Sequence, residues 1–215
     1  MRSPKECLDQ ARLYGILDLG YVEADEVETV TRALLSGGVD LLQLRAKGWE
    51  QSRILELGRR IRPLCGEAGV PFIVNDYSPV AIELEADGLH LGQDDGSYSE
   101  ARAEVGAGMF LGRSTHSPDQ ARQALADGFD YIGFGPLFPT PTKAGRPGIG
   151  IQSVELVERE VGEKIPVFCI GGIRRDNLPV VIEAGASRAV IVSDLLKAVD
   201  VAGAVREARA GLTAG

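Results

Sequence analysis

The sequence predicts an α/β protein in which a single domain, residues 1–215, forms a parallel (β/α)8 TIM barrel. Eight short apolar runs alternate with segments of helical periodicity, whereas an open doubly wound sheet usually has fewer strands. Glycines such as Gly38, Gly69 and Gly185 also stand before these runs, where a helix must end and the chain must turn back. The length is sufficient for one such barrel without insertions.

The expected strands are short apolar runs that alternate with the helical segments. They span residues 13–17, 41–44, 72–74, 88–91, 109–111, 131–134, 167–170 and 189–192. In a barrel of this kind the ligand site lies at the carboxyl ends of the strands. Polar side chains that directly follow these runs are therefore the candidate site residues.

Helix signals fill the segments between the strands. Ile54, Leu57, Ile61 and Leu64 recur at helical spacing, and Pro63 is expected to kink or end that helix. Further helices are expected to begin at Ser117-Pro118-Asp119, at Ser153 and at Asp176. A last amphipathic helix is expected at residues 201–212.

The net charge of −8, from 31 acidic and 23 basic residues, argues against a nucleic-acid partner, because a phosphate backbone requires a basic face. The chain has no apolar run near the roughly 18 residues of a membrane span, and residues 1–11 do not resemble a secretory signal. A cytoplasmic protein with small-molecule partners is expected, and the sequence is compatible with a homo-oligomer. Cys7, Cys65 and Cys169 are expected to be reduced packing residues.

A proline-rich segment, residues 131–143, follows the sixth expected strand. Pro136, Pro139 and Pro141 remove three backbone donors and favour a stiff, extended loop. The loop carries two hydroxyls and one ammonium, which together suit an anionic ligand. These groups belong to Thr140, Thr142 and Lys143. The alternative is an ordinary surface connection with a solvated lysine.

The second expected strand ends in an amide and two cations. Alternation along the strand puts Gln43 and Arg45 on the same face, toward the mouth of the barrel, with Lys47 just beyond them. This arrangement indicates a second group of anion ligands. The alternative is a pair of exposed loop cations.

Carboxylates follow the third and fourth expected strands. Asp76 and Asp95 come from neighbouring strand ends beside the cations, and they suit Mg2+ that also binds a phosphate. The alternatives are an N-cap role for Asp76 and a turn role for Asp94-Asp95-Gly96. His90 alternates with apolar residues, so an interior histidine is favoured over a metal ligand.

The remaining strand ends add further polar groups. Ser114 and His116 follow the fifth strand, and the pair Gly171-Gly172 follows the seventh. Loops after the seventh and eighth strands of such barrels commonly hold a phosphate through backbone N–H groups. Gly172 and Ser193 are therefore expected to belong to a second phosphate site, opposite the first.

Taken together, these strand ends resemble the thiamine-phosphate synthase (thiamine-phosphate pyrophosphorylase) family over nearly the whole chain. The matching motifs are QLRAK at 43–47, VND at 74–76, HLGQDD at 90–95, STHS at 114–117, GFGPLFPTPTK at 133–143, IGGI at 170–173 and VS at 192–193. That family is a family of transferases. It joins 4-amino-5-hydroxymethyl-2-methylpyrimidine diphosphate to 4-methyl-5-(2-hydroxyethyl)thiazole phosphate and releases diphosphate.

The resemblance implies a role for each matching residue. The pyrimidine diphosphate would be bound by Gln43, Arg45, Lys47, Asn75, Ser114 and Lys143. Of these, Arg45, Lys47 and Lys143 would be catalytic, because they neutralise the leaving diphosphate together with Mg2+ on Asp76 and Asp95. The thiazole phosphate would be bound by Thr140, Thr142, Gly172, Val192 and Ser193. Diphosphate would leave ahead of attack, and no general base would be required, since the attacking nitrogen carries no proton.

Two positions depart from the commonest family pattern, Tyr77 and Arg113. Arg113-Ser-x-His116 also occurs in the related thiazole tautomerases, which share the barrel and isomerise the thiazole. If this chain were a tautomerase, His116 would be its general acid/base. A tautomerase is therefore one alternative. A non-catalytic barrel that binds a thiazole or thiamine phosphate is another.

Overall fold

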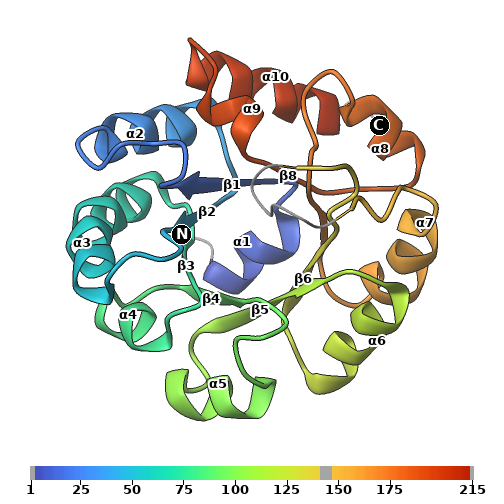
Figure 1. Cartoon of the computed structure of the whole chain (residues 1–215), viewed down its shortest axis with the longest axis horizontal. Coiled ribbons are helices and arrows are strands. Elements are labelled where there is room, and N and C mark those ends of the chain that lie inside the picture. Colours follow the sequence, from blue (N-terminus) through green and yellow to red (C-terminus); the bar gives the residue numbers. More distant parts are fainter. Residues whose placement is uncertain (1–2, 141–146, 214–215) are drawn as a thin grey trace.

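The computed structural model describes residues 3–140 and 147–213, and within them eight parallel strands close into a barrel (Figure 1). The strands are β1 (Leu13–Asp18), β2 (Leu41–Arg45), β3 (Phe72–Asn75), β4 (Gly88–Leu91), β5 (Phe110–Thr115), β6 (Tyr131–Phe134), β7 (Val167–Cys169) and β8 (Ala189–Ile191). Each strand pairs in parallel with the next, and β8 pairs with β1 to close the ring. The predicted TIM barrel is confirmed. That residues 1–215 form a single domain stays a prediction.

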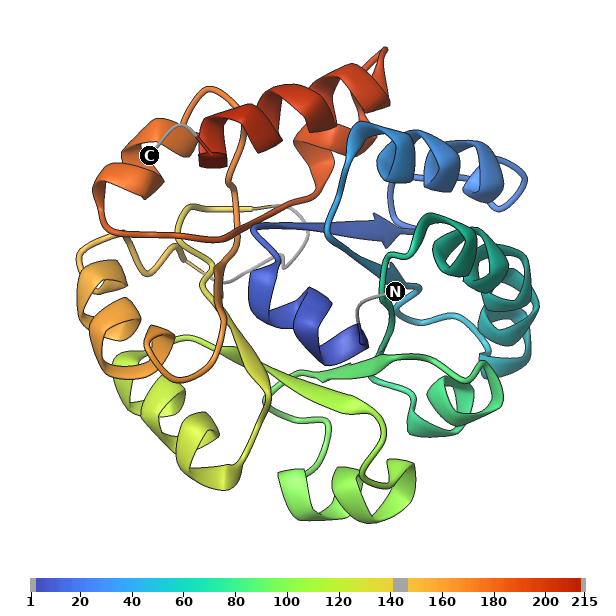
Figure 2. The same cartoon turned by 180° about the vertical axis from the view of Figure 1, so that it is seen from behind.

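Helices surround the barrel on its outer face, as Figures 1 and 2 show from opposite sides. They are α2 (Val27–Gly37), α3 (Gln51–Ala68), α4 (Ser78–Glu83), α5 (Tyr98–Val105), α6 (Pro118–Asp127), α7 (Val154–Val157) with the π-helical turn η2 (Glu158–Gly162), α8 (Leu178–Glu183), α9 (Ser193–Leu196) and α10 (Val201–Thr213). Gly38 and Gly69 cap α2 and α3 with left-handed backbone as expected, and Gly128 caps α6 in the same way. Gly185 comes one residue after the C-cap of α8, Ala184, with a φ of 101°.

Helix α1 (Pro4–Gln10), which the sequence analysis did not predict, lies differently from the others. It crosses the centre of the ring in both views (Figures 1 and 2). Its Leu8 is fully buried and packs with residues inside the barrel, such as Ile73 and Phe168. The short helix therefore closes the amino-terminal end of the barrel and leaves the opposite end for ligands.

The expectation that Pro63 kinks or ends its helix is wrong as regards the helix end. Helix α3 continues past Pro63 to Ala68, where Gly69 caps it. A proline inside a helix costs about 3 kcal/mol. Burial of Leu64 and Cys65, which are 7% and 0% exposed, offsets this cost because both side chains reach the core only while the helix continues.

The helix expected to open at Asp176 begins two residues later. Asn177 is the N-cap residue of α8, and its Oδ1 accepts a hydrogen bond of 2.7 Å from Arg174 N. Asp176 instead forms an ion pair with Arg174 at 3.0 Å. Ser117 caps α6 as predicted, because its Oγ accepts a hydrogen bond from Gln120 N.

A layer of aromatic rings fills the interior of the barrel. Tyr14, Tyr131 and Phe168 are at most 2% exposed and contact one another edge to face, with ring centroids 5.3 to 5.9 Å apart. Such edge-to-face pairs are favourable beyond the area that they bury. Because this layer is solid, a ligand can enter only above it, at the carboxyl ends of the strands.

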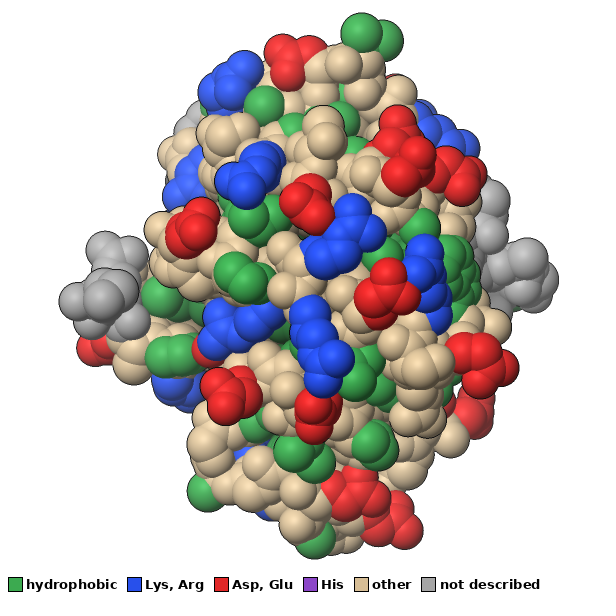
Figure 3. All heavy atoms as spheres, turned by 90° about the vertical axis from the view of Figure 1, so that its left-hand side faces the viewer, with side chains coloured by type: hydrophobic (Ala, Val, Ile, Leu, Met, Phe, Trp, Pro, Cys, Tyr) green, Lys and Arg blue, Asp and Glu red, His purple; other side chains and the backbone are tan. Residues whose placement is uncertain are grey.

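The outer face that includes α2 and α3 carries acidic and basic side chains in alternation (Figure 3). Several form ion pairs between helices, such as Arg60 with Glu28 at 2.8 Å and Arg59 with Glu83 at 2.9 Å. Mixed charge of this kind gives no extended basic surface on this face. Among the described helices, none combines the length and the apolar character that crossing a membrane would require.

We predict that Gly112→Ala destabilises the protein by about 2–3 kcal/mol, the usual cost of overpacking a core. Gly112 pairs with Tyr131 across β5 and β6, and a Cβ at Gly112 would lie only 2.0 Å from Tyr131 Cζ. Urea denaturation measures the change. Gly108→Ala is the matched control, because a Cβ at Gly108 meets nothing within 4 Å. Equal midpoints for the two variants would contradict this account of the interior.

Candidate active site

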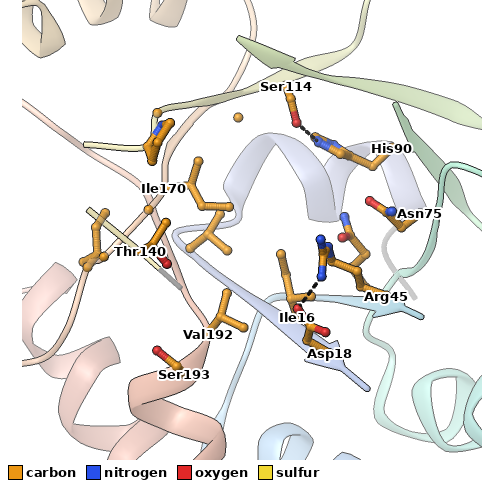
Figure 4. A pocket seen from close by; sticks show the side chains of 18 of the residues that line it. Ile16, Asp18, Arg45, Asn75, His90, Ser114, Thr140, Ile170, Val192 and Ser193 are labelled. Atoms are coloured by element: carbon orange, nitrogen blue, oxygen red, sulfur yellow. Dashed lines mark hydrogen bonds and ion pairs between the residues drawn. The ribbon is translucent and has the colours of Figure 1, made fainter. Parts of the chain in front are cut away.

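A pocket of about 750 Å³, counted to its open mouth, lies at the carboxyl ends of the strands (Figure 4). Many of the residues predicted for the site line it together: Gln43, Arg45, Asn75, Ser114, Thr140, Gly172, Val192 and Ser193. Thr142 and Lys143 lie outside the described residues. The structure therefore brings together side chains from strand ends that are far apart in the sequence.

The labelled lining residues form two groups that face each other across the pocket (Figure 4). One group follows β1 to β5 and includes Arg45, Asn75 and Ser114. The other includes Thr140, after β6, and Ser193, which begins α9 after β8. That these two groups form two separate anion sites stays a prediction.

Arg45 is held by an ion pair that the sequence analysis missed. Its Nη1 lies 2.6 Å from Oδ2 of Asp18, which is 2% exposed. The other oxygen of Asp18 accepts a hydrogen bond of 2.9 Å from Gly20 N. A guanidinium has five N–H donors, so Arg45 keeps donors for a ligand while Asp18 fixes its direction. The available signal was the position of Asp18, directly after an apolar run.

The two predicted metal ligands contact each other outside the pocket lining. Asp76 forms a side-chain hydrogen bond with Asp95, and Lys47 Nζ lies 4.0 Å from Asp76 Oδ2. Burial, with the hydrogen bond and charge of Asp95, raises the pKa of Asp76 to about 6, against the lowering effect of Lys47 and Arg45. Two adjacent carboxyl groups that resist ionising together are a donor set that fits a hard divalent cation.

The alternative roles of these two carboxylates have different outcomes. Asp76 does not cap α4, whose N-cap residue is Tyr77. Asp76 instead adopts a left-handed φ of 68°, which Asp tolerates better than most residues, and its N–H donates to His90 O. Asp95 does hold a turn, because its Oδ2 accepts a 2.8 Å hydrogen bond from Gly92 N.

Arg113, one of the two departures from the family pattern, supports the loop that carries Asp95. Its guanidinium donates to Gly96 O at 2.7 Å and to Gln93 O at 3.1 Å, and it lies 5.4 Å from the ring centroid of Phe129. These contacts tie the loop after β4 to the end of β5. In this structure Arg113 has a structural role at the edge of the site.

The described residues contain no group of three or more His, Cys, Asp or Glu side chains around one metal position. Asp76 and Asp95 alone would leave most ligand positions to phosphate and water oxygens. That division is normal for Mg2+, which is usually bound by one or two carboxylates together with substrate phosphates.

The glycine pair after β7 lies against the loop that follows β6. A Cβ on Gly171 would come within 2.3 Å of Pro136 Cα, and the backbone of Gly171 and Gly172 is left-handed, with φ of 96° and 65°. Phe138 N donates to Gly171 O at 3.0 Å, and Asn177 Nδ2 donates to Gly172 O at 3.0 Å. Only glycine permits this close approach.

Both histidines of the chain line the pocket. His90 bonds through Nδ1 to the hydroxyl of Tyr131 and through Nε2 to that of Ser114, each at 3.0 Å. His116 bonds through Nδ1 to the carbonyl of Gly135, so that nitrogen carries a proton. His90 is thus held in the interior as expected, but it also reaches the site through Ser114.

A (β/α)8 barrel with cations, hydroxyls and a glycine pair at the carboxyl ends of its strands is typical of the enzymes that share this barrel. Residues 13–195 match the family model described as thiamine monophosphate synthase. The chain therefore belongs to the thiamine-phosphate synthase family, which consists of transferases.

Individual relatives agree with this assignment. The chain is 49% identical to the thiamine-phosphate synthase of Thermus thermophilus over 179 residues, which cover 83% of this chain and 85% of that protein. It is 40% identical to that of Bacillus velezensis over 205 residues, with coverage of 93% and 89%. A solved structure of thiamine phosphate pyrophosphorylase from Pyrococcus furiosus matches with a TM-score of 0.84 and 32% identity, and covers 97% of this chain and 96% of that one.

We predict that Asp18→Asn destabilises the protein by about 2–3 kcal/mol, because it leaves the cation of Arg45 largely buried without its counter-ion. The side chains of Arg45 and Asp18 are 15% and 3% exposed. Chemical denaturation measures the change. The control, Asp176→Asn, breaks an exposed pair with Arg174 and should leave the unfolding midpoint unchanged. Similar effects of the two substitutions on the unfolding midpoint would show that the Arg45–Asp18 ion pair contributes no more to stability than an exposed pair.

We also predict that Asp95→Asn stabilises the protein by about 1 kcal/mol at neutral pH in the presence of a chelator, because it removes a like charge beside Asp76. The pKa of Asp76 is raised from 3.8 to about 6, so its ionisation opposes folding above that range. The gain should be full above about pH 6 and should shrink as the pH falls toward 3.8. Urea unfolding across this pH range tests it, and a loss of stability at neutral pH would refute it.

Proposed function

We propose that the protein couples 4-amino-5-hydroxymethyl-2-methylpyrimidine diphosphate with 4-methyl-5-(2-hydroxyethyl)thiazole phosphate, and that the products are thiamine phosphate and diphosphate. Membership of the thiamine-phosphate synthase family supports this reaction. The observation that carries the proposal is the pocket with two facing polar groups, since a coupling enzyme must hold two anionic substrates side by side.

The diphosphate belongs, in this proposal, on the side of β1 to β5. Arg45 is aimed at the pocket by Asp18, and Lys47 lies beside the carboxyl pair. Gln43 and Asn75 add neutral polar groups to the same side. Mg2+, bound by Asp76 and Asp95, would neutralise charge on the leaving diphosphate. Lys143 would add a further cation from the proline-rich loop, by the match of that loop to the family motif.

The thiazole phosphate belongs on the opposite side. Thr140 and Ser193 offer hydroxyls there, and Gly172 and Val192 line the same wall. Thr142 would add a third hydroxyl, again by the match to the family motif. Close packing of Gly171 on Pro136 supports a fixed position for this wall, which a site for one small phosphate ester needs.

The chemistry asks little of these residues beyond charge and position. An aminopyrimidine can stabilise positive charge on its exocyclic methylene, so the bond to diphosphate can break before the thiazole nitrogen attacks. That nitrogen carries no proton, and no general base is needed. Arg45, Lys47 and Lys143 stabilise the leaving group electrostatically, and the pocket walls hold the two reacting atoms within about 3–3.5 Å of each other.

Thiazole isomerisation is the second candidate function, because His116 lines the pocket and could act as a general acid/base. Its Nδ1 is bonded to the carbonyl of Gly135, which orients the ring. Isomerisation has no use for Asp76, Asp95, Arg45 and Lys47, however. The presence of all four in this chain favours coupling.

Incubation of the purified protein with both substrates and Mg2+ tests the proposal. We expect one diphosphate for each thiamine phosphate, and no product when either substrate or Mg2+ is omitted. Chromatography of thiamine phosphate and an assay for diphosphate measure the two products. Conversion of the thiazole without the pyrimidine would instead indicate a tautomerase, and binding of thiamine phosphate without turnover would indicate a non-catalytic barrel.

We predict that Asp76→Asn lowers the turnover of the coupling reaction at least about 100-fold, the scale of losing one stabiliser of transition-state charge. Asn suits the left-handed backbone at this position, so the fold is retained. Asp94→Asn is the matched control, because Asp94 is exposed, carries the same charge in the same loop as Asp95, and has no proposed metal role. Turnover of Asp76→Asn close to that of Asp94→Asn would contradict the role of Asp76.

A further inference from the structure

A chain of buried and partly buried hydrogen bonds crosses the interior of the barrel beneath the pocket. Gln43 Nε2 bonds to the hydroxyl of Tyr14 at 2.6 Å, and this hydroxyl lies 3.1 Å from that of Tyr131. Tyr131 in turn lies 3.0 Å from His90 Nδ1, and His90 Nε2 lies 3.0 Å from Ser114 Oγ. The chain thus joins β2, β1, β6, β4 and β5, and both of its ends line the pocket.

The hydrogen bonds of this chain run in one direction when His90 is neutral and the Gln43 amide is oriented as in the structure. Gln43 Nε2 can only donate, so the hydroxyl of Tyr14 accepts from it. The hydrogen of Tyr14 then needs an acceptor, because an unsatisfied buried donor is costly, and the hydroxyl of Tyr131 is the one to which it bonds among the described residues. Tyr131 therefore donates to His90 Nδ1. A neutral imidazole carries one proton, so His90 Nε2–H donates to Ser114 Oγ.

Burial keeps the two tyrosines of the chain neutral, and packing fixes their rings. Burial raises the pKa of both Tyr14 and Tyr131 well above the ordinary value, so both hydroxyls keep their protons. Phe168 packs edge to face against both rings. Gly112 leaves the room that the Tyr131 ring occupies. Neither tyrosine ring can turn without breaking this packing.

We propose that Tyr14, Tyr131 and His90 are positioning residues for the pyrimidine substrate, an inference that rests on the proposed function. Their chain holds the Oε1 of Gln43 as an acceptor toward the pocket and the hydroxyl of Ser114 as a donor. An aminopyrimidine offers the complement, an amino group that donates and a ring nitrogen that accepts. A 4-oxo pyrimidine offers an acceptor where the amino group would be. The buried chain therefore selects the 4-amino substrate and rejects its deaminated analogue.

The first test compares turnover of the 4-amino pyrimidine diphosphate with that of its 4-oxo analogue, in the wild type and in Tyr131→Phe. Without the Tyr131 hydroxyl, His90 Nδ1 loses the donor that fixes the tautomer and the orientation of the ring, so His90 no longer holds the Ser114 hydroxyl as a donor toward the ligand. We expect the preference for the amino substrate to fall about tenfold and its KM to rise about tenfold, the scale of one hydrogen bond. The KM for the thiazole phosphate should not change.

Tyr98→Phe is the matched control, because it removes a tyrosine hydroxyl from α5, at a distance from the pocket lining. It should leave the preference and both KM values unchanged. Tyr14→Phe interrupts the same chain one bond earlier, and it replaces Tyr131→Phe as the test variant if the latter does not fold. Equal preferences in the wild type and the interrupted variants would overturn the inference.

The second test does not depend on activity. The chain has only two histidines, so 15N NMR can assign the tautomer of each ring with single histidine substitutions. We expect His90 to carry its proton on Nε2 in the wild type, where Nδ1 accepts from Tyr131, and we expect the 15N shift of Nδ1 to change in Tyr131→Phe, where that hydrogen bond is lost. A wild-type His90 protonated on Nδ1 would overturn the assigned direction. If the wild type forms no thiamine phosphate, the proposed function fails, whereas the tautomer still shows whether the chain runs as described.

Discussion

The parallel pairing that closes the ring of strands is the constraint on which the rest of the molecule depends. Because all strands run in one direction, their carboxyl ends share one rim. Closure between Leu13 of β1 and Ala189 of β8 brings the last strand beside the first. Arg45 and Ser193, almost 150 residues apart in the sequence, consequently line one pocket. The helices can then vary on the outside without moving these ends.

The cation and the carboxylates at the rim of the barrel have different surroundings. Arg45 is matched internally, by an almost fully buried aspartate that also holds the following turn. Asp76 and Asp95 are left against each other, with Lys47 at the limit of an ion pair. The ion pair of Arg45 with Asp18 stabilises the folded chain and fixes the direction of the Arg45 side chain. The contact of Asp76 with Asp95 costs stability in the absence of a cation, which is a common feature of sites shaped for a ligand.

The sequence was sufficient to predict the barrel, because apolar runs and the polar residues after them are local signals. Eight of the predicted binding residues line one pocket, but the roles of Asn75 and Val192 were implied only by the family resemblance. Asp18 was missed because strand β1 continues one residue past the apolar run, held by its pairing with β2. Tyr14 and Tyr131 looked like ordinary apolar strand residues. Their hydroxyls meet only once the barrel closes, so no spacing along the chain reveals the contact.

The aromatic layer also has a consequence for how new substrates could arise in such a molecule. The Tyr131 ring fills the space that a side chain at position 112 would take, so the aromatic layer leaves no room for an added group on the part of a ligand that faces it. The walls, by contrast, are made by loops that several short contacts hold in place. Ligands of a different shape can therefore be accommodated at the walls and the mouth of the pocket, by replacement of these loops. The depth of the pocket is set by the aromatic layer inside the barrel.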